Sequence, residues 1–343
     1  MVKCIRVPKK DAESIRSKLI ALGLLDRDYR IQSDNSDVLI PILLCKFEEF
    51  SSEDVEMERI EHKETDYRNL LNMDADLKEF LPSSFDTIGD VVVVKIPEEI
   101  IHFKNDIGKA IMDTTANVRT VMLDSGVKGE LRIRELEQIA GSGTSCTIHT
   151  EFGVRMVVDP GKVYFNSRLA TERKRIASLV KDHEIIVDMF AGVGPFPLVI
   201  SKHANPEMIY SIDLNPDATE FTKQNVEMNK VKNITPLNGD AATVMKGIPK
   251  ADRVIMNLPQ SATEFLDLAL ECVKVGGMIH LHKILERSEL EEFIENLTLK
   301  MKEKGYEMIL DNISELKTYS PTMSVYVFDI VRRAQSNHHL RRM

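Results

Sequence analysis

Cysteine is scarce in this 343-residue chain, and the cysteines it has are not spaced as metal ligands. The four stand at Cys4, Cys45, Cys146 and Cys272. They are too scattered for a zinc ribbon or a Cys-x-x-Cys redox site, so we expect reduced, buried thiols and no metal site. A signal-type apolar segment and any run of 18 apolar residues are also lacking, which predicts a cytoplasmic protein.

An excess of positive charge is lacking as well. The chain has 45 lysines and arginines against 54 acidic residues, a formal net charge of −9. This mean charge argues against a nucleic-acid partner unless the basic residues gather in one place, because phosphate binding needs local positive potential. The length and the 43% hydrophobic content predict a globular protein of two or three domains.

The first half of the chain predicts two small α+β domains. Residues 1–60 contain a strand, a helix from Asp11 to Leu22 and the apolar run VLIPILL, and the acidic segment 48–64 predicts a linker. Residues 61–166 contain the strands DVVVVKIP and VRTVML with a helix between them. The alternating stretches SCTIHTE, VRMVVD and KVYF then predict an antiparallel meander.

Residues 167–335 have a different rhythm, in which helices alternate with apolar strands. The strands are EIIVDMF, MIYSIDL, ITPLNGD, DRVIMNLP and MIHLHKI, and SVYVFDIVR closes the series. This alternation predicts an α/β domain with a doubly wound, Rossmann-like parallel sheet. We expect residues 336–343 to be a disordered tail.

Two glycines follow the first strand of this series, in MFAGVGPF. Gly192 and Gly194 allow the backbone to approach a ligand beyond the carboxyl end of the strand. A dinucleotide fingerprint would require a third glycine where Pro197 stands, which counts against a dehydrogenase.

Three carboxylates stand at matching places on successive strands. Asp188 precedes the glycines and could hold a positively charged group through bridging water or the backbone. Asp213 ends the next strand, where a carboxylate accepts from ribose hydroxyls, and Asp240 follows the third, where it could accept from an adenine amino group. S-adenosyl-methionine carries an adenine, a free ribose and a cationic end, so we predict it as the ligand. The alternative is that these acids only cap helices and lie in solvent.

The fourth strand ends in NLPQ. Asn257 would place an amide beside the reacting methyl group and Pro259 would stiffen the turn, although a plain turn is the alternative. Amino-methylating enzymes of the NPPY kind carry an aromatic residue where this chain has Gln260, which argues against chemistry on an exocyclic amine.

One carboxylate lies on the apolar stripe of the helix SRLATERKRIASLVKDH. Leu169, Ile176, Leu179 and Val180 form this stripe, and Glu172 falls among them at helical spacing. A carboxylate that faces inward should have a raised pKa, which makes Glu172 a candidate general base. A structural ion pair with a neighbouring arginine is the alternative.

Positive charge gathers immediately before the glycine loop. A charge run is usually a solvated helix face, but this position in an acidic chain predicts that phosphates approach the pocket. The cluster consists of Lys162, Arg168, Arg173, Lys174 and Arg175, with Lys128, Arg132 and Arg134 in KGELRIRELE.

The segments RIRELEQIAG, TIH, KVYFNSRLATERKRI, VDMFAGVGPF, IDLNP and VIMNLP together resemble the archaeal and eukaryotic tRNA (guanine-37-N1)-methyltransferase family. The resemblance runs in order through roughly residues 85–330 and implies a class I methyltransferase domain. It implies methylation of N1 of guanosine 37 by S-adenosyl-methionine, in a monomer whose macromolecular partner is tRNA. The N-terminal domain would contact the outer corner of the tRNA, and the other domains the anticodon stem and the extruded base.

The resemblance also implies roles for individual residues. Glu172 would be the general base, Arg132 would engage the guanine or the charge that develops on its oxygen, and Asn257 with Pro259 would orient the base. The methyl donor would be surrounded by Tyr164, Phe190, Asp213, Asn215 and Asp240, with Asp188, Ala191, Gly192, Val193, Gly194, Leu214, Ala241 and Asn257. Thr144 stands where relatives carry an arginine, so one phosphate contact is in doubt.

Two alternatives stay open. Paralogues in the wyosine pathway use the same fold to alkylate a derivative of guanosine 37, but the intact NLP and FAGVGPF segments favour N1 methylation. A non-catalytic RNA-binding module is the alternative from another class.

Overall fold

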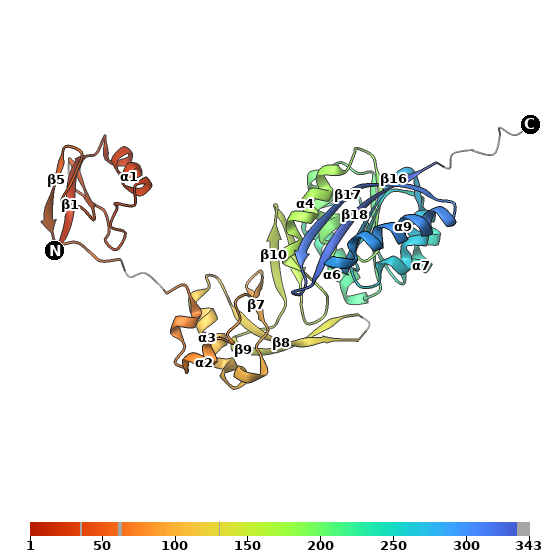
Figure 1. The fold of residues 1–343 in the computed structure, drawn as a ribbon, viewed down its shortest axis with the longest axis horizontal. Coiled ribbons are helices and arrows are strands. Elements are labelled where there is room, and N and C mark those ends of the chain that lie inside the picture. Colours follow the sequence, from red (N-terminus) through yellow and green to blue (C-terminus); the bar gives the residue numbers. More distant parts are fainter. Residues whose placement is uncertain (35, 61–63, 130, 335–343) are drawn as a thin grey trace, which may run out of the picture. The chain divides into compact units, whose positions relative to one another are not determined.

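The computed structural model describes residues 1–34, 36–60, 64–129 and 131–334. The chain divides into two compact units, Met1–Leu70 and Leu71–Met343 (Figure 1). The tail expected at residues 336–343 lies outside the described residues.

The first unit is an antiparallel sheet with one helix. The strand order is β2-β3-β1-β5-β4, and helix α1 (Ala12–Ala21) buries Ile15 and Leu19. These side chains join Ile5 and Val7 of β1 in a small core. A 3-10 turn, η1 (Tyr67–Leu70), ends the unit. The strands are β1 (Val2–Pro8), β2 (Gln32–Ser33), β3 (Asp37–Pro41), β4 (Lys46–Phe47) and β5 (Phe50–Val55).

Strand β5 corrects one prediction, because it lies inside the acidic segment that predicted a linker. Its backbone pairs with β1 from Val2↔Val55 to Ile5↔Ser52. The acidic side chain of Glu53 stays exposed and accepts a hydrogen bond from Arg6. A strand that buries little of either face can carry polar and charged side chains. The acidic composition of this segment was therefore not sufficient to exclude a strand.

The second unit begins with a four-stranded sheet and a hairpin. The sheet has the order β6-β7-β8-β9, with β7 parallel to β8 and the other neighbours antiparallel. Helix α3 connects β7 to β8 and packs on β8 and β9. The elements are α2 (Ala75–Lys78), β6 (Asp86–Ile88), β7 (Val91–Val94), η2 (Glu98–Phe103), α3 (Lys104–Thr114), β8 (Thr120–Lys128), β9 (Ile133–Gly141), and the hairpin β10 (Thr147–Glu151) and β11 (Val154–Val158).

The third predicted strand of the meander, KVYF, is not a strand. Asp159 starts a turn in which its carbonyl oxygen accepts from the amides of Lys162 and Val163. Val163 and Phe165 are buried and Tyr164 is exposed, so the side chains alternate between the interior and the solvent as they would in a strand. The backbone instead contacts α6, because the Lys162 carbonyl accepts from Asn215 Nδ2 at 2.8 Å.

The remainder of the second unit is a seven-stranded sheet in the order β14-β13-β12-β15-β16-β18-β17. Strands β12 to β16 are parallel, as predicted, whereas β17 and β18 are antiparallel. Figure 1 shows β16, β18 and β17 beside one another. The strands are β12 (Ile185–Asp188), β13 (Met208–Asp213), β14 (Ile234–Asn238), β15 (Ala251–Met256), β16 (Val273–Glu286), β17 (Glu307–Thr318) and β18 (Met323–Arg333).

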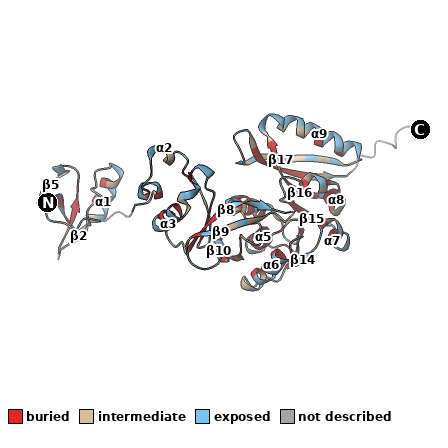
Figure 2. Ribbon diagram, turned by 90° about the horizontal axis from the view of Figure 1, so that it is seen from below, coloured by how far each residue is buried: buried red, intermediate tan, exposed pale blue. Residues whose placement is uncertain are grey.

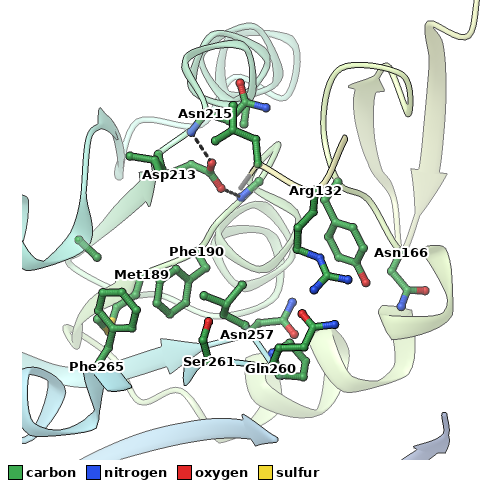
Figure 3. Close-up of a pocket in the computed structure, with 18 of the residues that line it drawn as sticks. Arg132, Asn166, Met189, Phe190, Asp213, Asn215, Asn257, Gln260, Ser261 and Phe265 are labelled. Atoms are coloured by element: carbon green, nitrogen blue, oxygen red, sulfur yellow. Dashed lines mark hydrogen bonds between the residues drawn. The ribbon is translucent and has the colours of Figure 1, made fainter. Parts of the chain in front are cut away.

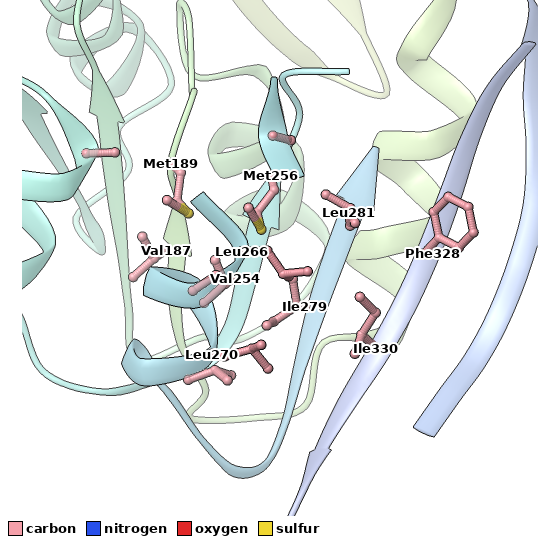
Figure 4. Close-up of a cluster of buried hydrophobic side chains, with 14 of the residues drawn as sticks. Val187, Met189, Val254, Met256, Leu266, Leu270, Ile279, Leu281, Phe328 and Ile330 are labelled. Carbon is pink, nitrogen blue, oxygen red and sulfur yellow. The ribbon is translucent and has the colours of Figure 1, made fainter. Parts of the chain in front are cut away.

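Helices cover both faces of this sheet, which makes it doubly wound. One face packs against α4, α5 and α6 and against β11 of the hairpin. The other packs against α7, α8 and α9 (Figure 4). Figure 2 shows the exposed outer side of α9. The helices are η3 (Ser167–Leu169), α4 (Ala170–Leu179), α5 (Pro195–His203), α6 (Pro216–Met228), α7 (Ala241–Val244), η4 (Met245–Gly247), η5 (Ala262–Phe265), α8 (Leu266–Cys272), η6 (Arg287–Glu289) and α9 (Leu290–Glu303).

The burial of single residues corrects two further predictions. Leu179 was placed on the apolar stripe of α4 but is 39% exposed, because the helix ends at that residue. Of the four cysteines, all free thiols, Cys4 alone is buried, while Cys45 is exposed. Among the described residues, no helix combines the length and the apolar character needed to cross a membrane.

Candidate active site

A pocket of about 520 Å³ lies at the carboxyl ends of the parallel strands. Its position follows from the topology, since the strand order reverses between β12 and β15 and leaves a crevice there. The predicted residues that line it are Arg132, Tyr164, Phe190, Gly192, Asp213, Leu214, Asn215, Asp240, Ala241, Asn257 and Pro259 (Figure 3).

The glycine loop forms the floor between β12 and α5. Gly192 and Gly194 both have left-handed backbones, with φ of 56° and 80°. A Cβ on Gly194 would lie 2.9 Å from Thr222 Cγ2, so a larger residue would have to shift this side chain of helix α6. The loop therefore needs glycine for its conformation and for its close contact with α6.

Asp213 holds two loops in place at the end of β13. Its Oδ2 accepts from the Gly192 amide at 2.6 Å and its Oδ1 from the Asn215 amide at 2.8 Å. Burial raises the pKa of this carboxyl, and these two amide hydrogen bonds act in the opposite direction. The carboxylate still reaches the pocket, so it can accept further hydrogen bonds from a ligand.

Asp188 does not line the pocket but lies behind the glycine loop. It is fully buried, with Oδ1 accepting from the Phe190 amide at 3.3 Å and Oδ2 without a hydrogen-bond partner among the described residues. Burial, with a smaller contribution from the nearby Asp213, raises its pKa to about 8. Of the two routes predicted to link Asp188 to a cationic group, bridging water or the backbone, the structure shows a contact with the loop backbone.

This raised pKa predicts a pH-dependent stability. Between the ordinary value of 3.8 and about 8, the native state retains a proton that the unfolded chain releases. Stability must therefore fall as the pH rises through this window. We expect the Tm of the wild type to drop between about pH 4 and pH 8 and then level off, and that of D188N to drop less, by a difference on the order of several degrees. Equal drops in thermal melts of the two proteins would contradict the assignment.

Glu172 also lies outside the pocket lining, one helical turn beyond Leu169, which does line it. Its carboxylate is 3% exposed and receives two hydrogen bonds of 2.7 Å from Arg175. Burial alone would raise the pKa of Glu172, but the hydrogen bonds from Arg175 hold it below its ordinary value. The predicted raised pKa is therefore wrong, and the alternative of an ion pair with a neighbouring arginine is confirmed.

Arg132 and Asn257 lie near one another in the pocket (Figure 3), and Pro259 also lines it. The guanidinium carbon of Arg132 lies 6.0 Å from the ring centroid of Tyr164, and Arg132 itself has a left-handed backbone with φ of 55°. The carbonyl of Pro259 accepts from the Ile284 amide at 2.9 Å, which ties the NLPQ turn to β16.

Not all of the predicted basic cluster is available to phosphates. Arg173 is 1% exposed and binds the Glu151 carboxylate through hydrogen bonds of 2.5 and 2.7 Å, and Arg175 is engaged by Glu172. Arg173 belongs to a buried ion pair, which corrects its assignment as an RNA contact, whereas Arg175 is paired but keeps 30% of its side chain exposed. Lys162 and Arg168 are exposed, and Lys174 is half-buried.

Sequence reasoning missed part of the pocket. Lys317 and Tyr319, at and just beyond the end of β17, line it, but β17 itself was not predicted. Burial and the nearby Arg168 lower the pKa of Lys317. Gln260 and Ser261 also line the pocket, and their position directly after the NLP turn was the available signal.

Three family models match the chain. They describe a TRM5/TYW2 methyltransferase domain at residues 147–309, a TYW2 N-terminal domain at 67–144 and a tRNA methyltransferase 5 N-terminal domain at 4–44.

Individual relatives agree with these models. The tRNA (guanine(37)-N(1))-methyltransferase Trm5b of Pyrococcus abyssi is 41% identical over 82% of this chain and 84% of its own length. A crystal structure of Trm5b from this organism gives a TM-score of 0.82 at 35% identity, covering 97% of this chain and 100% of that one.

Two further matches bear on substrate and partner. A structure described as the complex of aTrm5 and tRNALeu gives a TM-score of 0.76 at 33% identity, covering 97% and 100%. A tRNA(Phe) (4-demethylwyosine(37)-C(7)) aminocarboxypropyltransferase of Methanocaldococcus jannaschii is 32% identical over 71% of this chain and 96% of its own. The chain belongs to the TRM5/TYW2 methyltransferase family.

Proposed function

We propose that this protein transfers the methyl group of S-adenosyl-methionine to N1 of guanosine 37 in tRNA. The observation that carries the proposal is the pocket itself, which brings Asp213, Arg132 and the NLPQ turn together with a buried carboxylate one helical turn away.

The residues present fit the methyl donor. Asp213 and Asp240 offer acceptors for ribose hydroxyls and an adenine amino group, and Phe190 offers an aromatic face. Gly192, which has a left-handed backbone and no side chain, lines the pocket and lets a ligand approach the backbone closely. When bound, S-adenosyl-methionine supplies a methyl group already activated by its sulfonium.

The residues of the chain then have to remove the proton of guanine N1 and stabilise the negative charge that develops on the base oxygen. Guanine N1 carries a proton, which must leave as the methyl group arrives, and we assign its removal to Glu172. Negative charge develops on the base oxygen, and Arg132 and Asn257 are the donors placed to stabilise it. Pro259 would hold the extruded base in position beside them.

Each of the three parts of the chain has a proposed contact with a different region of the tRNA. We assign residues 1–60 to the outer corner, and residues 61–166 and 167–335 to the anticodon stem and the target base. Matches at 4–44, 67–144 and 147–309 support three parts, the third beginning inside residues 61–166. Lys162, Arg168, Lys174 and Arg175 remain the candidates for phosphate contacts, since they are at least partly exposed.

A methyl-transfer assay on unmodified tRNA transcripts tests the proposal. Paired transcripts carry guanosine or adenosine at position 37, and mass spectrometry of nucleosides identifies the product. We expect N1-methylguanosine from the guanosine transcript alone. The second candidate is alkylation of a wyosine precursor, which the match to a TYW2 N-terminal domain favours. Activity on precursor tRNA with none on guanosine would assign the protein to that reaction.

A further inference from the structure

His282 of β16 lies against Glu172 and has no role in the activity described above. Its side chain is completely buried, and Nε2 lies 3.6 Å from Glu172 Oε1, beyond hydrogen-bonding distance. Among the described residues, neither ring nitrogen has a hydrogen-bond partner. The ring packs edge-on against Phe196 of α5, with centroids 6.0 Å apart. Burying two unpaired polar atoms is costly, so this imidazole needs an explanation.

Glu172 ends a buried chain of charged contacts that runs across the sheet. Arg175 bridges Glu172 to Asp329 of β18, with a 2.7 Å hydrogen bond from Nη1 to Oδ2 of the aspartate. His280 Nδ1 contacts Asp329 Oδ1 at 2.5 Å, and Arg253 links His280 to the Glu184 carboxylate. This chain of contacts therefore contains three carboxylates and two guanidinium groups. It carries one negative charge in excess when His280 and His282 are neutral. The carboxylates are those of Glu172, Asp329 and Glu184, and the guanidinium groups those of Arg175 and Arg253. One added proton makes the chain of contacts neutral.

His280 cannot take this proton. Arg253 Nη1 lies 2.7 Å from His280 Nε2, and a guanidinium group only donates, so Nε2 must accept. The remaining nitrogen, Nδ1, then carries the hydrogen that it donates to Asp329. Burial is the main reason why the pKa of His280 is lowered, which agrees with a neutral ring.

We propose that His282 is the residue that finally accepts the proton removed from guanine N1, by way of Glu172. This inference rests on the proposed function. As the N1–methyl bond forms, the electron pair of the breaking S–CH3 bond stays on sulfur, and the N1–H proton passes to a Glu172 oxygen. It then moves to Nε2 of His282, so the carboxylate is restored and an imidazolium forms. His282 does not touch the guanine and acts only through Glu172, to which it returns the proton for release after the tRNA leaves.

The physical advantage is that Glu172 is held as a weak base by Arg175. A carboxylate whose pKa is lowered is a poor final site for a proton, whereas imidazoles as a class are stronger bases than carboxylates. Two charged groups lie near Glu172 and His282. Arg175 binds the Glu172 carboxylate, and Asp329 binds the other side of the Arg175 guanidinium group.

The test compares H282Q and H282F with the wild type in single-turnover methyl transfer from about pH 5 to pH 8, the range in which histidine titrates. Glutamine keeps a hydrogen-bonding side chain but cannot accept the proton, and phenylalanine keeps the ring. We expect both variants to be slower by about tenfold or more near neutral pH, with donor affinity retained. The wild-type rate should rise with pH along an acid limb that both variants lack. A wild-type rate in H282Q, or a slower rate with the acid limb intact, would overturn the proposal.

A second measurement does not depend on activity. In 15N spectra of histidine-labelled protein, assigned by comparison with H282Q, the titration of His282 should move to lower pH in E172Q, because the facing carboxylate is gone. An unchanged titration would overturn the coupling. Wild-type protein without methyl transfer to guanosine 37 would instead overturn the proposed function.

Discussion

Replacing Glu172 with glutamine should lower the single-turnover rate of methyl transfer by about a hundredfold or more, the range typical of a lost general base. The amide has nearly the same shape but cannot take the N1 proton. Donor affinity should change by less than about twofold, because Glu172 does not line the pocket. Rapid-quench transfer assays and calorimetric titration with S-adenosyl-methionine measure the two quantities.

The chain offers a matched control for this variant. Glu151 is also a buried carboxylate paired with an arginine of α4, through Arg173, and it lies outside the pocket. E151Q removes the same type of ion pair, so it should lower the Tm as E172Q does while leaving the transfer rate within about threefold of the wild type. Equal rate losses in both variants would show that disruption of α4, rather than a missing base, slows the reaction.

The lowered pKa of Glu172 does not disqualify it as the base. The carboxylate is ionised throughout the neutral range, so it is always ready to accept a proton. The N1 proton becomes much more acidic once the methyl group begins to bond, since a cation would otherwise form on the ring. A weak base is then sufficient, provided that it is positioned where the proton leaves.

The sequence predicted the parts of the site that are local. The glycine loop, Asp213 and the NLP turn each follow a strong strand signal, and the parallel order of these strands brings their ends together. The inward position of Glu172 followed from helical spacing. Its Arg175 partner was also within reach, because the two residues are three apart on one helix, and including this pair would have reversed the predicted pKa shift.

The remaining partners of Glu172 could not be predicted in this way. Asp329 and His282 come from strands more than a hundred residues later, and their approach depends on the antiparallel pairing of β16 with β18. Strand β17 was missed because many of its side chains are polar or charged. The pocket residue Lys317, which lies on this strand, was missed with it. Likewise, local charge could not show that Arg173 turns inward to Glu151, a residue of the preceding hairpin.

Replacing Asp213 with alanine should raise the Kd for S-adenosyl-methionine by about 10- to 100-fold, the cost of losing hydrogen bonds to a charged group. Two effects act together in this variant. The ligand loses a carboxylate acceptor, and the amides of Gly192 and Asn215 lose the side chain that holds both loops at the pocket. Affinity for tRNA should change by less than about threefold, since the exposed basic residues are untouched.

D217N separates these effects from a general loss of charge at this end of the sheet. Asp217 lies four residues away in the first turn of α6, is exposed, and is absent from the pocket lining. D217N removes one negative charge, as D213A does, so a purely electrostatic effect on the cationic donor would appear in both variants. If Asp213 acts by direct contact and by fixing the loops, D213A alone should weaken donor binding in calorimetric titration. Equal weakening in both variants would show an electrostatic effect, and no weakening in either would show that other groups hold the ribose and the loop. Either result would contradict a direct role of Asp213 in donor binding.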